Sequence, residues 1–161
     1  MATDLKSLAA SITCGFNVAA QNTPNAGYCN WADNATLNFI PTFGNAAGQA
    51  NQVYEFSGTG TTTIQLKGGS TVNPFGATFN PATICMVIVR VTTAASTVTL
   101  ACTGSTTAPL WFGSLTSTET VSDTSPLVRY NTAGWTAHTT DFLVITGGAA
   151  NYTVTLVGAQ A

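Results

Sequence analysis

The sequence predicts an all-β protein: a single antiparallel β-sandwich, jelly-roll-like, with about 8–10 strands and an extended N-terminal arm. Thr is its most abundant residue, and Thr and Val favour strands because a branched Cβ packs well on a pleated surface. Short segments that alternate apolar and polar residues recur between clusters of Gly, Pro, Asn and Ser. Only residues 4–10 are suited to a short helical turn.

The first part of the chain contains two alternating segments followed by a hairpin signal. Residues 11–19 and 35–40 alternate with period two, which is typical of half-buried strands. Residues 22–34 between them carry Pro, Gly and Asn and predict a loop. Residues 53–56 and 61–67 flank a Ser-Gly-Thr-Gly stretch whose glycines tolerate positive φ, a pattern that predicts a β-hairpin.

The second part of the chain carries the most apolar strand. Residues 84–92 are apolar on both faces over their first half, which is typical of a central sandwich strand. Together with residues 97–101 they predict a second hairpin. Residues 114–125 predict a polar connection. The remaining strands are predicted at residues 109–113, 126–130, 142–146 and 152–157.

The length of the chain, 161 residues, fits one domain with a substantial core. The strand pattern assigns residues 48–161 to the β-sandwich domain. Residues 1–47 are loop-rich and weakly periodic. They predict an N-terminal arm with the first strands, packed on the main domain.

The chain carries very little charge for its size. Charged residues make up 6% of it, against about 25% in an average soluble domain, and the formal net charge is −2. Copies of such a chain repel one another weakly. The composition suits a secreted domain or a subunit of a packed assembly, and we favour the assembly. With so few Lys and Arg residues there is no basic patch, so we expect no nucleic-acid partner.

The N-terminal residues do not form a secretory signal. Asp4 stands where a positively charged region is expected, and residues 8–12 are too short and polar for the apolar region of a signal. The longest apolar stretch, residues 84–89, ends at Arg90 and predicts a buried strand instead of a membrane span. We therefore expect synthesis in a cytoplasm without a signal peptide, and no membrane partner.

The chain has four cysteines, Cys14, Cys29, Cys85 and Cys102, and a single histidine, His138. None of the cysteines forms a C-x-x-C pair, so we expect no metal site and no cofactor. Cys85 and Cys102 lie on neighbouring predicted strands, where they could face each other. In a cytoplasmic product the favoured interpretation is that both are small buried hydrophobic residues.

No catalytic residues are predicted, and we expect no enzyme activity. His138 and Asp141 could be combined with one of many hydroxyls, but no Gly-x-Ser-x-Gly motif is present. His138 is interpreted as a loop residue hydrogen-bonded near the next strand. Glu119 and Asp123 are interpreted as the solvated face of a polar loop, and Asp33 and Asp141 as turn caps.

Three tryptophans define the main rival hypothesis, which is a carbohydrate- or cell-surface-binding module of a fibre or adhesin. Exposed aromatic rings on a sandwich can stack on sugars, so a glycan is a possible partner. Trp111 is interpreted as core, and Trp135 as closing a loop over the sandwich end. Trp31, with Tyr28 in the same loop, is expected at a surface. The candidate subunit or ligand contacts are thus Trp31, Trp135 and Tyr28.

An ordered series of short motifs runs through the sandwich region. It comprises Gly-x-Ala-Asn before a strand (48–54), Leu-x-Gly (66–68), Phe-Gly (75–76), Ile-x-x-Val-x-Val with a Thr-rich partner (84–90, 96–100), Pro-Leu-Val before Gly-Trp (126–128, 134–135), Thr-Asp-Phe-Leu-x-Ile (140–145) and Asn-Tyr-x-Val-x-Leu-x-Gly (151–158). This order resembles a family of small β-sandwich virion structural proteins of tailed bacteriophages. The Pro-Gly-Gly of that family is replaced by Thr-Ser-Pro at 124–126, and residues 1–47 have no counterpart.

The resemblance implies a virion structural protein encoded among head or tail genes. It implies a capsid decoration or minor head protein that acts by surface complementarity, and a tail component is the second alternative. The implied partners are copies of the chain itself, possibly as a trimer, and other virion proteins such as the major capsid protein. The implied location is the virion. The family defines no functional residues that could be transferred to this chain.

Overall fold

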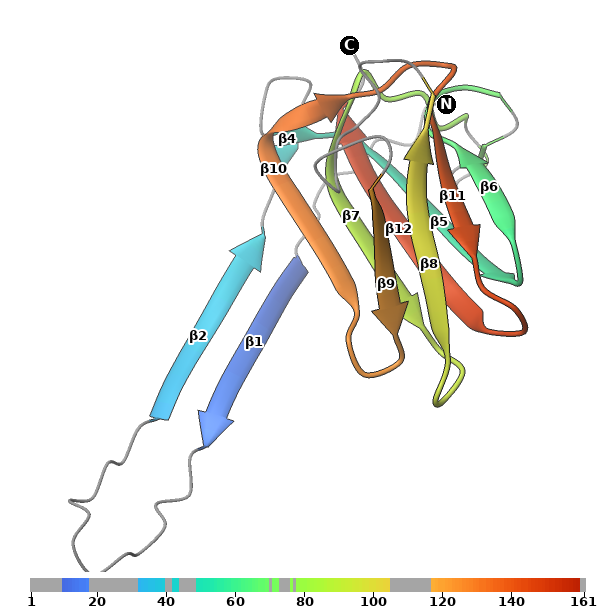
Figure 1. Cartoon of the computed structure of the whole chain (residues 1–161). Helices are drawn as coiled ribbons and strands as arrows, with labels where there is room; N and C mark the ends of the chain where they lie inside the picture. The colour runs from blue at the N-terminus through green and yellow to red at the C-terminus, as the bar shows by residue number, and fades with distance from the viewer. Residues whose placement is uncertain are drawn as a thin grey trace, which may run out of the picture. The chain divides into compact units, whose positions relative to one another are not determined.

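The computed structural model describes residues 10–17, 32–39, 42–43, 49–69, 71–72, 76, 78–104 and 117–159, with side chains from Ala50 onward. All of the secondary-structure elements in these ranges are strands (Figure 1). The chain divides into two compact units, one of Leu8–Ile40 and one of Met1–Ser7 with Pro41–Ala161. The expected boundary at residue 47 and the packing of the arm stay predictions.

The smaller unit is an antiparallel strand pair. Strand β1 (Ala10–Asn17) pairs with β2 (Ala32–Phe39) in a continuous register from Ala10 opposite Phe39 to Asn17 opposite Ala32. The period-two alternation predicted at residues 11–19 and 35–40 therefore corresponds to strands over residues 11–17 and 35–39, the parts that the structure describes. In the larger unit, two short strands, β3 (Thr42–Phe43) and β4 (Gln49–Ala50), pair in parallel.

The larger unit contains two antiparallel four-stranded sheets, which we call the first and the second sheet. The first sheet has the order β10-β7-β12-β5 and the second has the order β6-β11-β8-β9. Their strands are β5 (Gln52–Thr59), β6 (Thr62–Gln65), β7 (Thr83–Val91), β8 (Thr97–Thr103), β9 (Thr118–Ser122), β10 (Leu127–Thr136), β11 (Phe142–Thr146) and β12 (Asn151–Ala159).

The pairing of these strands is that of a jelly roll. β8 pairs with β9, β7 with β10, β6 with β11 and β5 with β12, so each earlier strand pairs with a correspondingly later one. The chain is therefore a long antiparallel ribbon that is wound so that successive pairs lie in alternate sheets, which is the jelly-roll arrangement. The predicted all-β, jelly-roll-like sandwich is confirmed.

Both predicted hairpins of the sandwich are wrong in their pairing, although their strands are real. β5 and β6 lie in different sheets, and so do β7 and β8. Period-two alternation shows which side chains face the core, but it does not show which strand lies alongside. A short connection such as Thr92–Ser96 can close a hairpin or cross between two facing sheets, and here it crosses.

In the two four-stranded sheets, the sequence patterns miss one strand and predict another too short, and they also miss the short strands β3 and β4. β9 lies within the predicted polar connection, because an edge strand with one polar face carries few apolar residues. β10 continues to Thr136 through an irregular register between Tyr130 and Trp135. The strand predicted at 109–113 lies outside the described residues.

The core lies between the two sheets and is built mainly from alternate residues of the strands, whereas β7 is buried on both faces from Ile84 to Val87, as predicted for a central strand. Leu156 of β12, opposite Val87 and Tyr54, is completely buried, and so are Leu100 and Leu143 of the second sheet. Full burial of a Leu or Val side chain contributes about 1.5–3 kcal/mol. On the second sheet the intervening residues face outward, and most of them carry a hydroxyl group.

Candidate functional site

The predicted contact residues are only partly within the described structure. Trp31 and Tyr28, together with Trp111, lie outside the described residues. Trp135 lies in strand β10 opposite Ile84, and not in a loop as expected. Its half-buried side chain packs against the hydrophobic core, so much of the ring already contributes to the sandwich.

The two cysteines whose side chains the structure describes, Cys85 and Cys102, are buried free thiols. Cys85 lies in β7 of the first sheet and Cys102 in β8 of the second, so the expected neighbouring strands are not paired. Burial raises the pKa of the Cys85 thiol to about 11, and burial and the nearby Asp141 carboxylate raise that of Cys102 to about 12. The Cys85 thiol donates to the carbonyl of Val157 (3.4 Å). Thiols that stay protonated are poor nucleophiles, in agreement with the interpretation as buried hydrophobic residues.

Asp141 and His138 form a structural turn before β11. The amide of His138 donates to Oδ2 of the fully buried Asp141 (2.8 Å), and the amide of Asp141 donates to the carbonyl of His138 (3.1 Å). A Cβ on Gly104 would lie 2.6 Å from Asp141 Oδ1, and Gly104 has a φ of +143°, so this close approach requires glycine. The predicted roles of Asp141 as a turn cap and His138 as a hydrogen-bonded loop residue are confirmed.

Glu119 does not belong to a solvated loop. It lies in edge strand β9 opposite the buried Leu100, so its side chain starts on the inner face of the second sheet. Arg129 of β10, the edge strand of the first sheet, donates to Glu119 Oε2 at 3.1 Å. This ion pair joins the two sheets at one open side of the sandwich. Inward charges of this kind discourage edge-to-edge pairing with other chains.

The described part of the chain offers no metal centre: it contains no group of three or more His, Cys, Asp or Glu residues placed to hold an ion. A search of the same ranges for a helix with the length and hydropathy to cross a membrane finds none.

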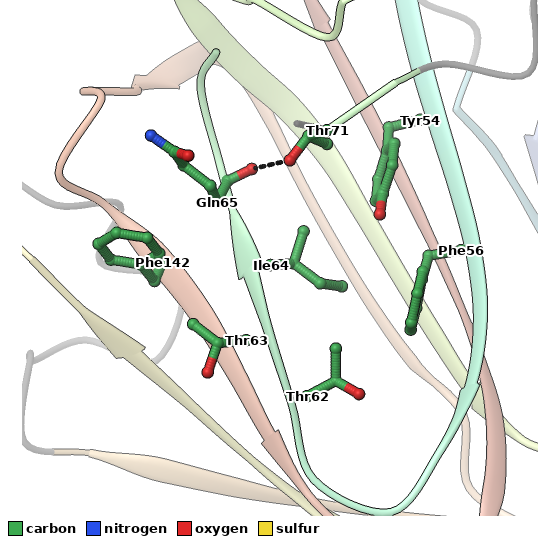
Figure 2. Close-up of a pocket in the computed structure, with 8 residues that line it drawn as sticks. All are labelled: Tyr54, Phe56, Thr62, Thr63, Ile64, Gln65, Thr71 and Phe142. Carbon is green, nitrogen blue, oxygen red and sulfur yellow. Dashed lines mark hydrogen bonds between the residues drawn. The ribbon is translucent and has the colours of Figure 1, made fainter. Parts of the chain in front are cut away.

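The other side of the sandwich is hollowed where edge strands β5 and β6 meet. We call this hollow the β5–β6 pocket. It has a volume of about 390 Å³ and is lined by Tyr54, Phe56, Thr62, Thr63, Ile64, Gln65, Thr71 and Phe142. Figure 2 shows the rings of Tyr54 and Phe56 one above the other on β5, facing Ile64 and Thr62 of β6. None of the sequence motifs indicated this pocket, because β5 and β6 were expected to pair with each other.

Hydroxyl side chains make up most of the outward surface of the second sheet. We call it the threonine face, and it consists of Thr63, Gln65, Thr97, Thr99, Ala101, Thr103, Thr118, Thr120, Ser122, Phe142, Val144 and Thr146. Thr146, Thr99 and Thr120 are direct cross-strand neighbours. This face carries no ionisable group, whereas the outward surface of the first sheet carries the exposed Glu55 and Arg90.

Comparisons with known proteins identify no relative of this chain. No protein-family model, curated protein or solved structure matches the chain. The described structure therefore defines a class only, a jelly-roll β-sandwich with one uncharged sheet surface.

Proposed function

We propose that this chain is a virion structural protein, a capsid decoration or minor head subunit that acts through contacts with neighbouring subunits. The observation that carries the proposal is the uncharged threonine face. A surface with hydroxyl and methyl groups and no ions can be covered by another subunit without leaving a buried unpaired charge. Surface charge also keeps copies of a soluble protein apart, and this face supplies none.

The fold and the sequence motifs support the same proposal. Jelly rolls are common in viral capsid domains, although they also occur in lectins and other proteins, so the fold alone does not define the function. The series of motifs between residues 48 and 158 resembles small virion proteins of tailed phages. A place in the tail is the alternative assignment within the same class.

The test of the assembly role compares two arginine variants of the full chain. Thr120→Arg places a charge on the exposed threonine face, and Ser57→Arg places the same charge on the exposed outward surface of the first sheet. Sedimentation velocity at several protein concentrations should show self-association of the wild type and of Ser57→Arg, and a shift towards monomer for Thr120→Arg. Circular dichroism checks that both variants are folded.

The test of the location uses particles produced from the genome that carries this gene. Mass spectrometry of purified heads and tails should find the chain in many copies, with heads as the expected fraction. Enrichment in tails would reassign the subunit to the tail. A wild-type chain that stays monomeric and is absent from particles would overturn the proposed function.

A further inference from the structure

We propose that the β5–β6 pocket is a binding site for a neutral saccharide, whether or not the chain belongs to a virion. Small-molecule pockets have volumes of about 300–1,000 Å³, and this pocket, at about 390 Å³, suits a ligand of one or two sugar rings. Its lining combines aromatic rings with hydroxyl side chains and the free backbone groups of β6, so it can pack against the apolar face of a sugar ring and hydrogen-bond the sugar hydroxyls.

The apolar wall of the pocket is formed by Tyr54 and Phe56. These residues alternate on β5, their ring centroids are 6.4 Å apart and their ring planes differ by only 12°. Tyr54 also packs against the fully buried Phe79, with centroids 5.6 Å apart, which fixes the wall to the core. The two rings are nearly parallel, and together they provide a firm apolar surface on which the C–H face of a sugar ring can pack.

Edge strand β6 supplies hydrogen-bonding groups on the opposite wall. The amide of Leu66 donates to the carbonyl of Asp141 at 2.9 Å, on the side of β11, whereas the carbonyl of Gln65 accepts from the Thr71 hydroxyl at 3.0 Å, on the free side. In an antiparallel ladder the direction alternates from residue to residue. The amide and carbonyl of Thr63 therefore point to the free side, and the Thr62 hydroxyl lies beside them in the lining.

A second feature beside the aromatic wall also indicates a polar ligand. The hydroxyl of Tyr152 is buried and has no hydrogen-bond partner among the described residues. Its ring lies next to Phe56, with centroids 6.3 Å apart, and its hydroxyl lies 3.2 Å from the Cβ position of Gly58. Buried hydroxyls are normally paired. A sugar hydroxyl that reaches past the half-buried Phe56 ring would provide the missing partner.

The lining favours a neutral saccharide over a charged ligand or an added peptide strand. None of the lining residues carries a charge at neutral pH, because Tyr54 is the only titratable one and burial raises its pKa above 10.0. Addition of a peptide strand to β6 would require a row of residues whose backbone amide and carbonyl groups are both free. β6 contains four residues, and Thr71 already occupies the carbonyl of Gln65, so Thr63 offers a single outward pair.

The experiment is a titration of the ¹⁵N-labelled full chain with glucose, galactose, N-acetylglucosamine and their β-linked disaccharides. We expect at least one sugar to shift the amide signals of Phe56 and Thr63 and to give saturation-transfer signals. Thr62→Val and Tyr152→Phe each remove one hydroxyl, and each should weaken binding by about two- to tenfold. Tyr152→Phe should at the same time raise the urea midpoint of the free protein, because it removes an unpaired buried group.

The matched control is Thr155→Val, which removes a hydroxyl from the outward surface of the first sheet and leaves the pocket unchanged. Its affinity should equal that of the wild type. The proposal would be overturned if no sugar gave a saturating shift, if the shifts mapped away from Phe56 and Thr63, or if Thr155→Val weakened binding as much as the pocket variants. Binding of an extended uncharged peptide at Thr63 in place of the sugars would overturn it in favour of strand addition. These outcomes are independent of the self-association test, since the pocket variants leave Thr120 in place.

Discussion

At the scale of single residues, burial decides the chemistry of the thiols. Cys85 and Cys102 are each about 1% exposed, and their surroundings raise the pKa of each thiol from 9.0 to about 11 and about 12. Desolvation by burial is the main cause in both cases, because a thiolate loses its hydration inside the sandwich. Residues of this kind influence stability at alkaline pH and do not supply a nucleophile at neutral pH.

The pH dependence of stability follows from these raised pKa values. Below pH 9.0 both the folded and the unfolded chain hold the thiol protons, so the stabilising effect of the raised pKa is complete. As the pH rises from 9.0 towards about 11, the unfolded chain releases its protons first, and stability falls by up to about 1.4 kcal/mol per pH unit for each thiol.

Urea unfolding at pH values below and above 9.0 measures this slope. Cys102→Val, which keeps the volume and removes the titrating group, should make the alkaline decrease shallower. Peptide mapping after iodoacetamide treatment should show Cys85 and Cys102 labelled only when urea unfolds the chain. Rapid labelling of either cysteine in the folded protein would contradict the buried, protonated state.

At the scale of secondary-structure elements, the two open sides of the sandwich are managed differently. The side between β9 and β10 is joined by the Glu119–Arg129 ion pair, whereas the side between β5 and β6 is hollowed into the pocket. The ion pair is well exposed, with side-chain exposures of 36% for Glu119 and 39% for Arg129. Water and salt screen such a pair, so it contributes little to stability. Its main effect is to place charged side chains at the sheet edges, where they discourage pairing with other chains.

A double-mutant cycle with Glu119→Gln and Arg129→Met should therefore give a small coupling free energy, about 0.2–1 kcal/mol, that decreases at high salt. Urea unfolding of the wild type, both single variants and the double variant provides the four values. Self-association of Glu119→Gln by edge pairing is an additional expectation. A coupling several times larger and insensitive to salt would show that the pair is a main element of stability.

The strands also show which features of the fold the sequence can predict and which it cannot. Alternation from Thr97 to Thr103 correctly separates the buried Val98 and Leu100 from the outward threonines, because strand periodicity is a local property. Pairing is not local: the apolar run of Ile84–Val91 would be the same whether its partner were β8 or, as observed, β10 and β12. The pocket was missed for this reason, since Tyr54 and Thr62 meet only when β5 and β6 lie in opposite sheets.

At the scale of the whole molecule, the jelly roll joins residues that are far apart in the chain. β5, the first strand of the sandwich, pairs with β12, the last, and Thr59 hydrogen-bonds Asn151 across 92 residues. β12 also pairs with β7, so this final strand occupies the interior of the first sheet. The first sheet is therefore incomplete until β12 is in place, and the search for such distant pairings makes folding slow.

A substitution at Leu156 tests this architecture, because Leu156 lies on β12 between Tyr54 and Val87 and is 0% exposed. Leu156→Ala should lower the free energy of unfolding by about 2–5 kcal/mol, since the cavity lies in a strand that connects β5 with β7. Thr155→Ala is the matched control on the same strand, because Thr155 is half-buried on the outward face, and it should cost less than about 1 kcal/mol.

Stopped-flow refolding followed by tryptophan fluorescence should place the folding time of the wild type in the range of milliseconds to seconds that is typical of β-sandwiches. If β12 docks late, Leu156→Ala should mainly accelerate unfolding and leave the folding rate nearly unchanged. Microsecond folding, or an equal loss of stability in Leu156→Ala and Thr155→Ala, would contradict a sandwich whose closure depends on its last strand.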